Sequence, residues 1–213
     1  MVLAENKLIY IADPMCSWCY GFSPELSRVV EVLGDRFSLQ LVMGGLRPYN
    51  TETMKQLGDF LSKHWQHVAE KSGQAFNYEI LNDHSFVYDT EPAARAVVVV
   101  RELQPGAEFS FFKLVQNAFY YENKNTNELE TYLPLIAQIG MEEKDFVEAF
   151  ASTEMKEKVR RDFEQAAGWG IAGFPSLIWQ QGTKLNLLSN GYKDANTLIP
   201  QIEKLLALDT KQD

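Results

Sequence analysis

Cys16 and Cys19 follow directly after a short apolar run and are the only two cysteines in the chain. The run Leu8-Ile9-Tyr10-Ile11 has the length and composition of a buried strand. Two residues between the cysteines, at the start of a helix, bring their sulfurs close enough to form a disulfide bond. A strand that leads into such a helix predicts an α/β unit with redox chemistry at the junction of the two elements.

The remaining elements extend this α/β pattern. Pro24 lies inside the helix that begins at Cys16, and because proline removes a backbone donor we expect a kink or a restart there. From about Thr51 to Ala167 apolar side chains recur with helical spacing, which predicts a stretch of helices. The predicted strands cover 7–12, 37–43, 175–180 and 185–189. The predicted helices cover 16–33, 91–103, 108–121, 128–139, 142–150, 153–167 and 196–208, together with one that carries Met54, Leu57, Leu61, Trp65 and Val68.

The composition argues against several classes of partner. With 46% apolar residues, the 213-residue chain can bury a core without a disulfide framework. The formal net charge of -9 disfavours nucleic acid, whose phosphates need clustered Lys and Arg. Residues 1–10 lack the basic region and apolar stretch of a signal peptide, and no segment reaches the roughly 20 apolar residues of a membrane span. We therefore expect a cytoplasmic protein with neither a nucleic-acid nor a membrane partner.

The two cysteines are expected to have different roles. Free backbone N–H groups and the positive end of the helix dipole favour a thiolate at the first turn, where Cys16 lies. Cys19 lies one turn deeper and is therefore more shielded from solvent. We expect Cys16 to be an exposed attacking thiolate and Cys19 to be the thiol that resolves the mixed disulfide.

A zinc site is the main alternative use of two cysteines. It would need two further ligands, and the only histidines are His64, His67 and His84. We interpret these three as solvated or hydrogen-bonded side chains and expect neither a metal nor another cofactor. An inert structural disulfide is disfavoured in a chain without secretory features.

Two segments, 13–22 (DPMCSWCYGF) and 170–176 (GIAGFPS), flank the long helical stretch. Through them the chain resembles the DsbA branch of the thioredoxin-fold superfamily, and in particular the cytoplasmic FrnE-like group of predicted protein disulfide isomerases. The fold that this resemblance implies is an α/β thioredoxin fold with a large all-helical insertion. The thioredoxin-like domain would comprise 1–48 and 168–213, and the helical insertion would comprise 49–167.

The resemblance also implies an activity and a site. The protein would be a thiol-disulfide oxidoreductase or isomerase that acts on protein thiols through Cys16 and Cys19. A cis peptide bond before Pro175 would expose the backbone of Phe174 to an extended substrate. Trp18, Phe174 and Pro175 are therefore the predicted substrate-binding residues. The Ser-Trp pair between the cysteines and the bulky Phe174 differ from better-known family members, so the redox direction does not carry over.

Two questions stay open from the sequence. Trp18, Tyr20, Phe22 and Phe174 could form an apolar rim for unfolded chains, or Tyr20 and Phe22 could pack the helix onto the sheet. The function could instead be that of a glutathione-dependent transferase or isomerase of the kappa or 2-hydroxychromene-2-carboxylate isomerase type, although these generally carry serine at the first cysteine position. Glutathione is thus a possible partner. A non-catalytic chaperone or binding module is the third reading.

Overall fold

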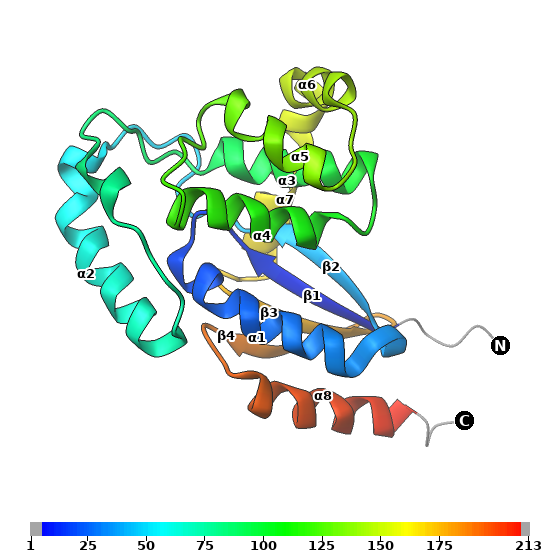
Figure 1. Ribbon diagram of the computed structural model, residues 1–213. Helices are drawn as coiled ribbons and strands as arrows, with labels where there is room; N and C mark the ends of the chain where they lie inside the picture. The colour runs from blue at the N-terminus through cyan, green and yellow to red at the C-terminus, as the bar shows by residue number, and fades with distance from the viewer. Residues whose placement is uncertain (1–5, 210–213) are drawn as a thin grey trace.

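A four-stranded sheet forms the centre of the computed structural model, which describes residues 6–209 (Figure 1). Its order is β2-β1-β3-β4, with β1 parallel to β2, and β3 antiparallel to both β1 and β4. The four predicted strands are confirmed, each end to within one residue. They are β1 (Asn6–Ala12), β2 (Ser38–Met43), β3 (Ser176–Gln181) and β4 (Lys184–Asn190).

Helices make up most of the remaining described chain. They are α1 (Ser17–Leu33), α2 (Met54–Ser72), α3 (Glu91–Leu103), α4 (Glu108–Tyr120), α5 (Leu133–Gln138), α6 (Glu143–Ala151), α7 (Thr153–Gly168) and α8 (Ala195–Asp209), with short 3-10 turns η1 (Gly34–Arg36), η2 (Glu79–Asn82) and η3 (Leu129–Thr131). The single helix predicted over 128–139 is wrong, because η3 precedes a separate α5 whose first turn holds Pro134. Among residues 6–209, no helix is both long and apolar enough to cross a membrane.

Helix α1 runs without interruption through Pro24, so the expected restart is absent. A proline at this position leaves the carbonyl group of Tyr20 without its usual helical donor. The side-chain Nε2 of Gln74 donates a hydrogen bond to that carbonyl oxygen at 3.2 Å. A donor that follows α2 in the sequence thus replaces the missing helical bond, and the helix continues.

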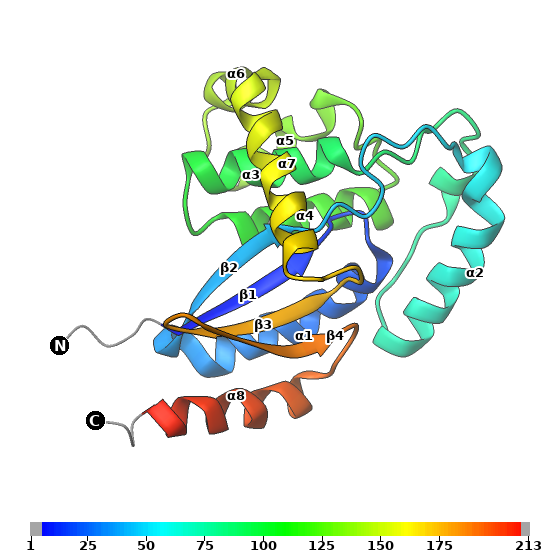
Figure 2. The ribbon, with the colours of Figure 1, turned by 180° about the vertical axis from the view of Figure 1, so that it is seen from behind.

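The side chains of β1 alternate between the two faces of the sheet. Leu8, Tyr10 and Ala12 join the large core cluster on the α1 face, while Ile9 and Ile11 join a small cluster that contains Ala166 of α7. Figures 1 and 2 show α1 and α8 on one face of the sheet and α7 on the other. The carboxyl end of β1 therefore lies between two helical layers, where it leads into the two cysteines.

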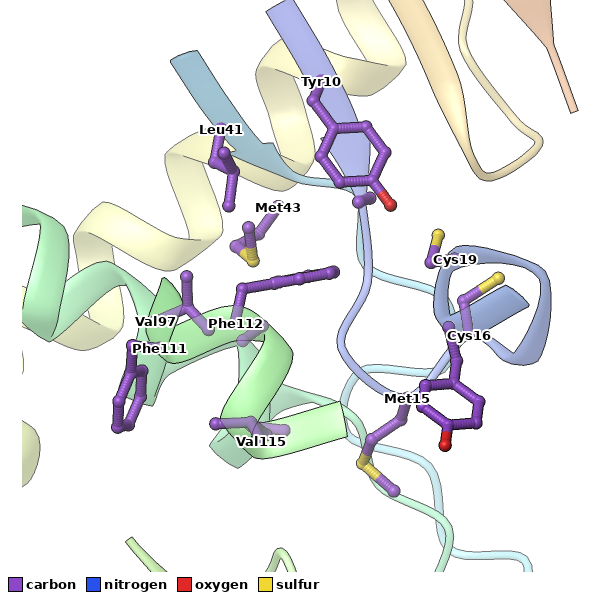
Figure 3. Close-up of a cluster of buried hydrophobic side chains, with 14 of the residues drawn as sticks. Tyr10, Met15, Cys16, Cys19, Leu41, Met43, Val97, Phe111, Phe112 and Val115 are labelled. Atoms are coloured by element: carbon purple, nitrogen blue, oxygen red, sulfur yellow. The ribbon is translucent and has the colours of Figure 1, made fainter. Parts of the chain in front are cut away.

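The helices α3 to α6 lie beyond β2 and share the large core cluster with the sheet (Figure 1). Figure 3 shows Leu41 and Met43 of the sheet beside Val97 and Phe112 of these helices. The proposed division into a domain of 1–48 and 168–213 and an insertion of 49–167 stays a prediction. Residues 1–5 and 210–213 of those ranges, including half of the amino-terminal segment used above to argue against a signal peptide, lie outside the described residues.

A largely buried ion pair joins α7 to both the sheet and α3. The carboxylate of Asp162 accepts two hydrogen bonds from Arg101, at 2.7 and 3.1 Å, and a third from the backbone N–H of Met43 at 2.8 Å. Arg101 also donates to the carbonyl oxygen of Leu41 at 3.0 Å. The pair therefore fixes the position of α7, the helix that leads to the loop before β3.

Replacing Asp162 with Asn should lower the free energy of unfolding by about 3 kcal/mol, because the largely buried Arg101 guanidinium would lose the nearer of its two counter-charges, Asp162 and Glu102. Urea denaturation measures the change. The matched control is Glu164→Gln on the same helix, whose exposed pair with Arg160 should contribute less than about 1 kcal/mol. Equal effects of the two substitutions would contradict this account of α7.

Candidate active site

Cys16 occupies the N-cap position of α1, directly after the loop that leaves β1. Its backbone is extended (φ -88°, ψ 116°), and its N–H donates to the carbonyl oxygen of Asp13 at 3.0 Å. No acidic side chain lies in the first turn of the helix. The free N–H groups of that turn and the positive end of the helix dipole therefore act on the Cys16 sulfur without a competing anion from the first turn.

The two cysteines are free thiols with different degrees of burial. Cys19 is completely buried, whereas 5% of Cys16 is exposed. The expectation that Cys16 is exposed is wrong, because the segment that ends at Phe174 covers it from a distant part of the chain. Burial, reinforced by the neighbouring Cys16, raises the pKa of the Cys19 thiol well above its usual value. Cys16 thus remains the more accessible thiol, and Cys19 remains protonated at neutral pH.

The loop between α7 and β3 brings Phe174 and Pro175 to the cysteines. The peptide bond between these two residues is cis. The Cys16 thiol donates to the carbonyl oxygen of Phe174 at a sulfur-to-oxygen distance of 3.6 Å. The Phe174 ring lies against Gly44 so closely that a Cβ atom there would be 2.1 Å from it, which explains the glycine at the end of β2.

A buried carboxylate joins the segments around the cysteines. Asp13 is completely buried and accepts hydrogen bonds from the N–H of Met15 at 2.8 Å, the N–H of Leu46 at 2.8 Å and the hydroxyl of Thr90 at 2.9 Å. Burial raises the pKa of Asp13 to about 6, although these three donors favour the charged form. The loops after β1 and β2 and the start of α3 are therefore tied to one group.

Trp18 forms part of an open cavity of about 540 Å³ beside the Phe174 loop. Its ring meets His67 edge-on at 5.5 Å between centroids and His64 at 6.2 Å, and it is tilted against Tyr192 at 6.0 Å. The other lining residues are Lys71, Phe174, Asn190 and Gly191. Helix α2 supplies His67 and Lys71 to this cavity, and the segment before α8 supplies the phenol of Tyr192.

The structure resolves the question of the apolar rim. Tyr20 and Phe22 are buried and pack α1 against the core, whereas Trp18 and Phe174 are only half-buried and line the cavity. Pro175 is buried beneath them. Trp18 and Phe174 thus line the same open cavity, and the substrate-binding role of all three residues stays a prediction.

Sequence reasoning missed the contribution of α2. His67 is exposed, in agreement with the expected solvated side chain, and His64 is half-buried; the rings of both also pack against Trp18. The four-residue spacing of His67 and Lys71 predicts a shared helix face, without indicating what that face meets. In the described part of the chain, no group of three His, Cys, Asp or Glu side chains is placed to hold a metal ion.

Known proteins resemble this chain over nearly its whole length. A family model described as the DSBA-like thioredoxin domain matches residues 8–202. A crystal structure from Nitrosomonas europaea, described as a "putative protein disulfide isomerase", is 34% identical, covers 96% of this chain and 98% of its own, and has a TM-score of 0.89. The cytosolic disulfide reductase DsbM from Pseudomonas aeruginosa is 27% identical, with coverages of 97% and 98% and a TM-score of 0.75. DsbM has also been solved with GSH, and that structure has a TM-score of 0.72.

A curated relative is more distant. The ClpXP adapter protein SpxH of Bacillus subtilis is 20% identical over 175 residues, which is 81% of this chain. The match spans 58% of the length of that relative.

The raised pKa of Asp13 predicts a specific pH dependence of stability. Between an unfolded pKa of about 3.9 and a folded pKa of about 6, only the native state binds this proton, so its contribution is present at low pH and is lost as the pH rises through 6. The stability of the parent relative to Asp13→Asn should therefore grow by about 2 kcal/mol between pH 7 and pH 4. Urea denaturation of both proteins across this pH range measures the difference in their free energies of unfolding. A difference that stays constant with pH would contradict the raised pKa of Asp13.

Proposed function

Because the chain belongs to the DSBA-like thioredoxin family, we propose that it is a thiol-disulfide oxidoreductase or isomerase acting on protein thiols through Cys16 and Cys19. One observation carries this proposal. Cys16 lies at the positive end of α1, is the more accessible of two neighbouring free thiols, and has the carbonyl oxygen of Phe174 3.6 Å from its sulfur. The names of the structural neighbours, a disulfide isomerase and a disulfide reductase, support it.

In the reducing direction Cys16 attacks a substrate disulfide. A bond forms between Cys16 and one substrate sulfur, and the other substrate sulfur leaves as a thiolate. Cys19 then attacks the Cys16 sulfur, which releases the second substrate thiol and leaves the enzyme disulfide. Oxidation of a substrate follows the same steps in reverse. The higher pKa of Cys19 supports this order, because Cys19 stays a thiol while Cys16 attacks.

The Phe174 carbonyl gives the substrate a place to bind. While Cys16 is a thiol, it donates to this oxygen. Once Cys16 enters a mixed disulfide it has no proton to donate, so the oxygen becomes available to an N–H group of an extended substrate chain, as in strand addition. Trp18 and the ring of Phe174 would then contact substrate side chains on either side of the bond. We assign this mode of binding to Trp18, Phe174 and Pro175.

We also propose that the protein works in the cytoplasm, in line with the description of its neighbour DsbM as cytosolic. In a reducing compartment the two cysteines would rest mainly as a dithiol. That resting state favours reduction and isomerisation over net oxidation.

Substitution of each cysteine separates the two roles. Cys16→Ser should reduce the catalysed reduction of a disulfide-containing unfolded protein to the uncatalysed rate. Cys19→Ser should instead accumulate a covalent complex between Cys16 and the substrate, because the resolving step is blocked. Non-reducing electrophoresis and mass spectrometry identify the complex. Full activity of Cys16→Ser, or of the double variant with serine at both positions, would contradict the proposal and favour a binding module.

Glutathione is a second candidate substrate, and the cavity beside Trp18 favours it. Lys71 offers positive charge to carboxylates there, His67 offers the nitrogens of its ring, and Trp18 and Phe174 offer apolar contacts. The structure of DsbM with GSH supports this reading. We propose that glutathione reduces the disulfide of Cys16 and Cys19 by attack on Cys16 from this cavity.

Lys71→Met should raise the KM for glutathione about threefold, as expected for an exposed charge pair, and should leave reduction by dithiothreitol unchanged. The rate of disulfide reduction as a function of thiol concentration measures both. Lys55→Met, on the same helix but in a different cavity, is the matched control. An unchanged KM for glutathione would exclude a role for Lys71 in its binding.

A further inference from the structure

Tyr10 is a buried residue of β1 that the proposed mechanism does not use. Its side chain is completely buried, and three aromatic rings surround it, with centroid distances of 5.8 Å to Phe22, 5.8 Å to Phe112 and 6.4 Å to Phe109. These rings fix the direction in which the phenol points. A fixed, buried polar group is costly unless it has a partner.

The hydroxyl group of Tyr10 points toward the sulfur of Cys19 (Figure 3). In the resting structure this hydroxyl has no hydrogen-bond partner among the described residues. Burial raises the pKa of Tyr10 well above its usual value, and the neighbouring Cys19 raises it further. The phenol therefore stays protonated at any pH at which the thiols react, and it remains a donor.

Asp13 is the one carboxylate among the groups that act on Cys19 in the described structure. The other side chains are Tyr10 from β1 and Cys16 from the start of α1, and the backbone N–H of Asp13 also donates to Cys19. The oxygens of Asp13 already accept hydrogen bonds from Met15, Leu46 and Thr90. Its carboxylate is thus committed to the loops, and the phenol is the side-chain donor aimed at the Cys19 sulfur.

We propose that Tyr10 is a positioning residue for Cys19, whose hydroxyl donates a hydrogen bond to the Cys19 sulfur when that sulfur becomes a thiolate and attacks Cys16. This rests on the proposed function, since it concerns the second step of the same reaction. A neutral donor is suited to this place, because a carboxylate beside a buried thiolate would repel it.

The step balances without a further reactant. The disulfide between Cys16 and the substrate breaks, and the disulfide between Cys16 and Cys19 forms. The electron pair of the broken bond leaves on the substrate sulfur. The proton lost by Cys19 ends on that departing sulfur, so the product is a thiol. Tyr10 keeps its own proton throughout and only donates a hydrogen bond.

Stopped-flow reaction of the reduced protein with Ellman's reagent separates the two steps. Attack by Cys16 releases the first thionitrobenzoate in a phase that depends on reagent concentration, and attack by Cys19 releases the second in a phase that does not. Tyr10→Phe should slow the second phase about tenfold or more and leave the first unchanged, since only Cys19 loses a donor. The pH at which the second phase reaches half its maximal rate should also move upward.

The control is Tyr132→Phe, which removes a buried tyrosine hydroxyl whose hydrogen bond goes to the carbonyl group of Thr126. It should change neither phase, even if it lowers stability. A second measurement does not depend on reaction rates. In the Cys16→Ser background, the pKa of Cys19 is measured from its thiolate absorbance, and Tyr10→Phe should raise it.

The outcomes are distinguishable. An unchanged second phase in Tyr10→Phe, or equal slowing of both phases, would overturn the role of Tyr10 while leaving the proposed function intact. Absence of a second phase in the parent protein would overturn the proposed function itself, because Cys19 would then not resolve the mixed disulfide.

Discussion

The buried carboxylate of Asp13 holds together the segments on which the site depends. It accepts hydrogen bonds from the loop before Cys16, from the loop after β2 and from Thr90 beside α3. Its burial costs free energy, which is visible in its raised pKa. In return, the amino terminus of α1 is fixed at the end of β1. The orientation of both cysteines follows from that one junction.

The site divides into two environments across the width of one helical turn. Cys16 lies at the amino terminus of α1, where its sulfur meets the Phe174 carbonyl and where the nearby Trp18 and Phe174 line an open cavity. Cys19 lies inside the core, where Tyr10 and Cys16 are its polar side-chain neighbours. This difference in burial supports the proposed division into an attacking thiol, Cys16, and a resolving thiol, Cys19.

Much of this arrangement follows from local sequence signals, and the remainder depends on tertiary contacts. The strands, most helices and the cysteine helix are predicted because periodicity and Pro or Gly positions encode them locally. The burial of Cys16 is not predicted from the sequence, because the covering residue Phe174 is 158 positions away in the chain. Tyr10 illustrates the same limit: the sequence predicts its strand, but only the docking of α1 brings Cys19 to its hydroxyl. The contact of His64 and His67 with Trp18 likewise requires α2 to pack beside α1.

We propose that Cys16 and Cys19 form one reversible, redox-active disulfide. Equilibration of the purified protein in glutathione redox buffers, followed by thiol labelling, tests it most directly. Both thiols should be oxidised together to the disulfide. The midpoint reduction potential should lie between about -120 and -270 mV, the interval from DsbA to thioredoxin. A midpoint below about -300 mV, or cysteines that resist labelling in the native protein, would indicate an inert pair and contradict it.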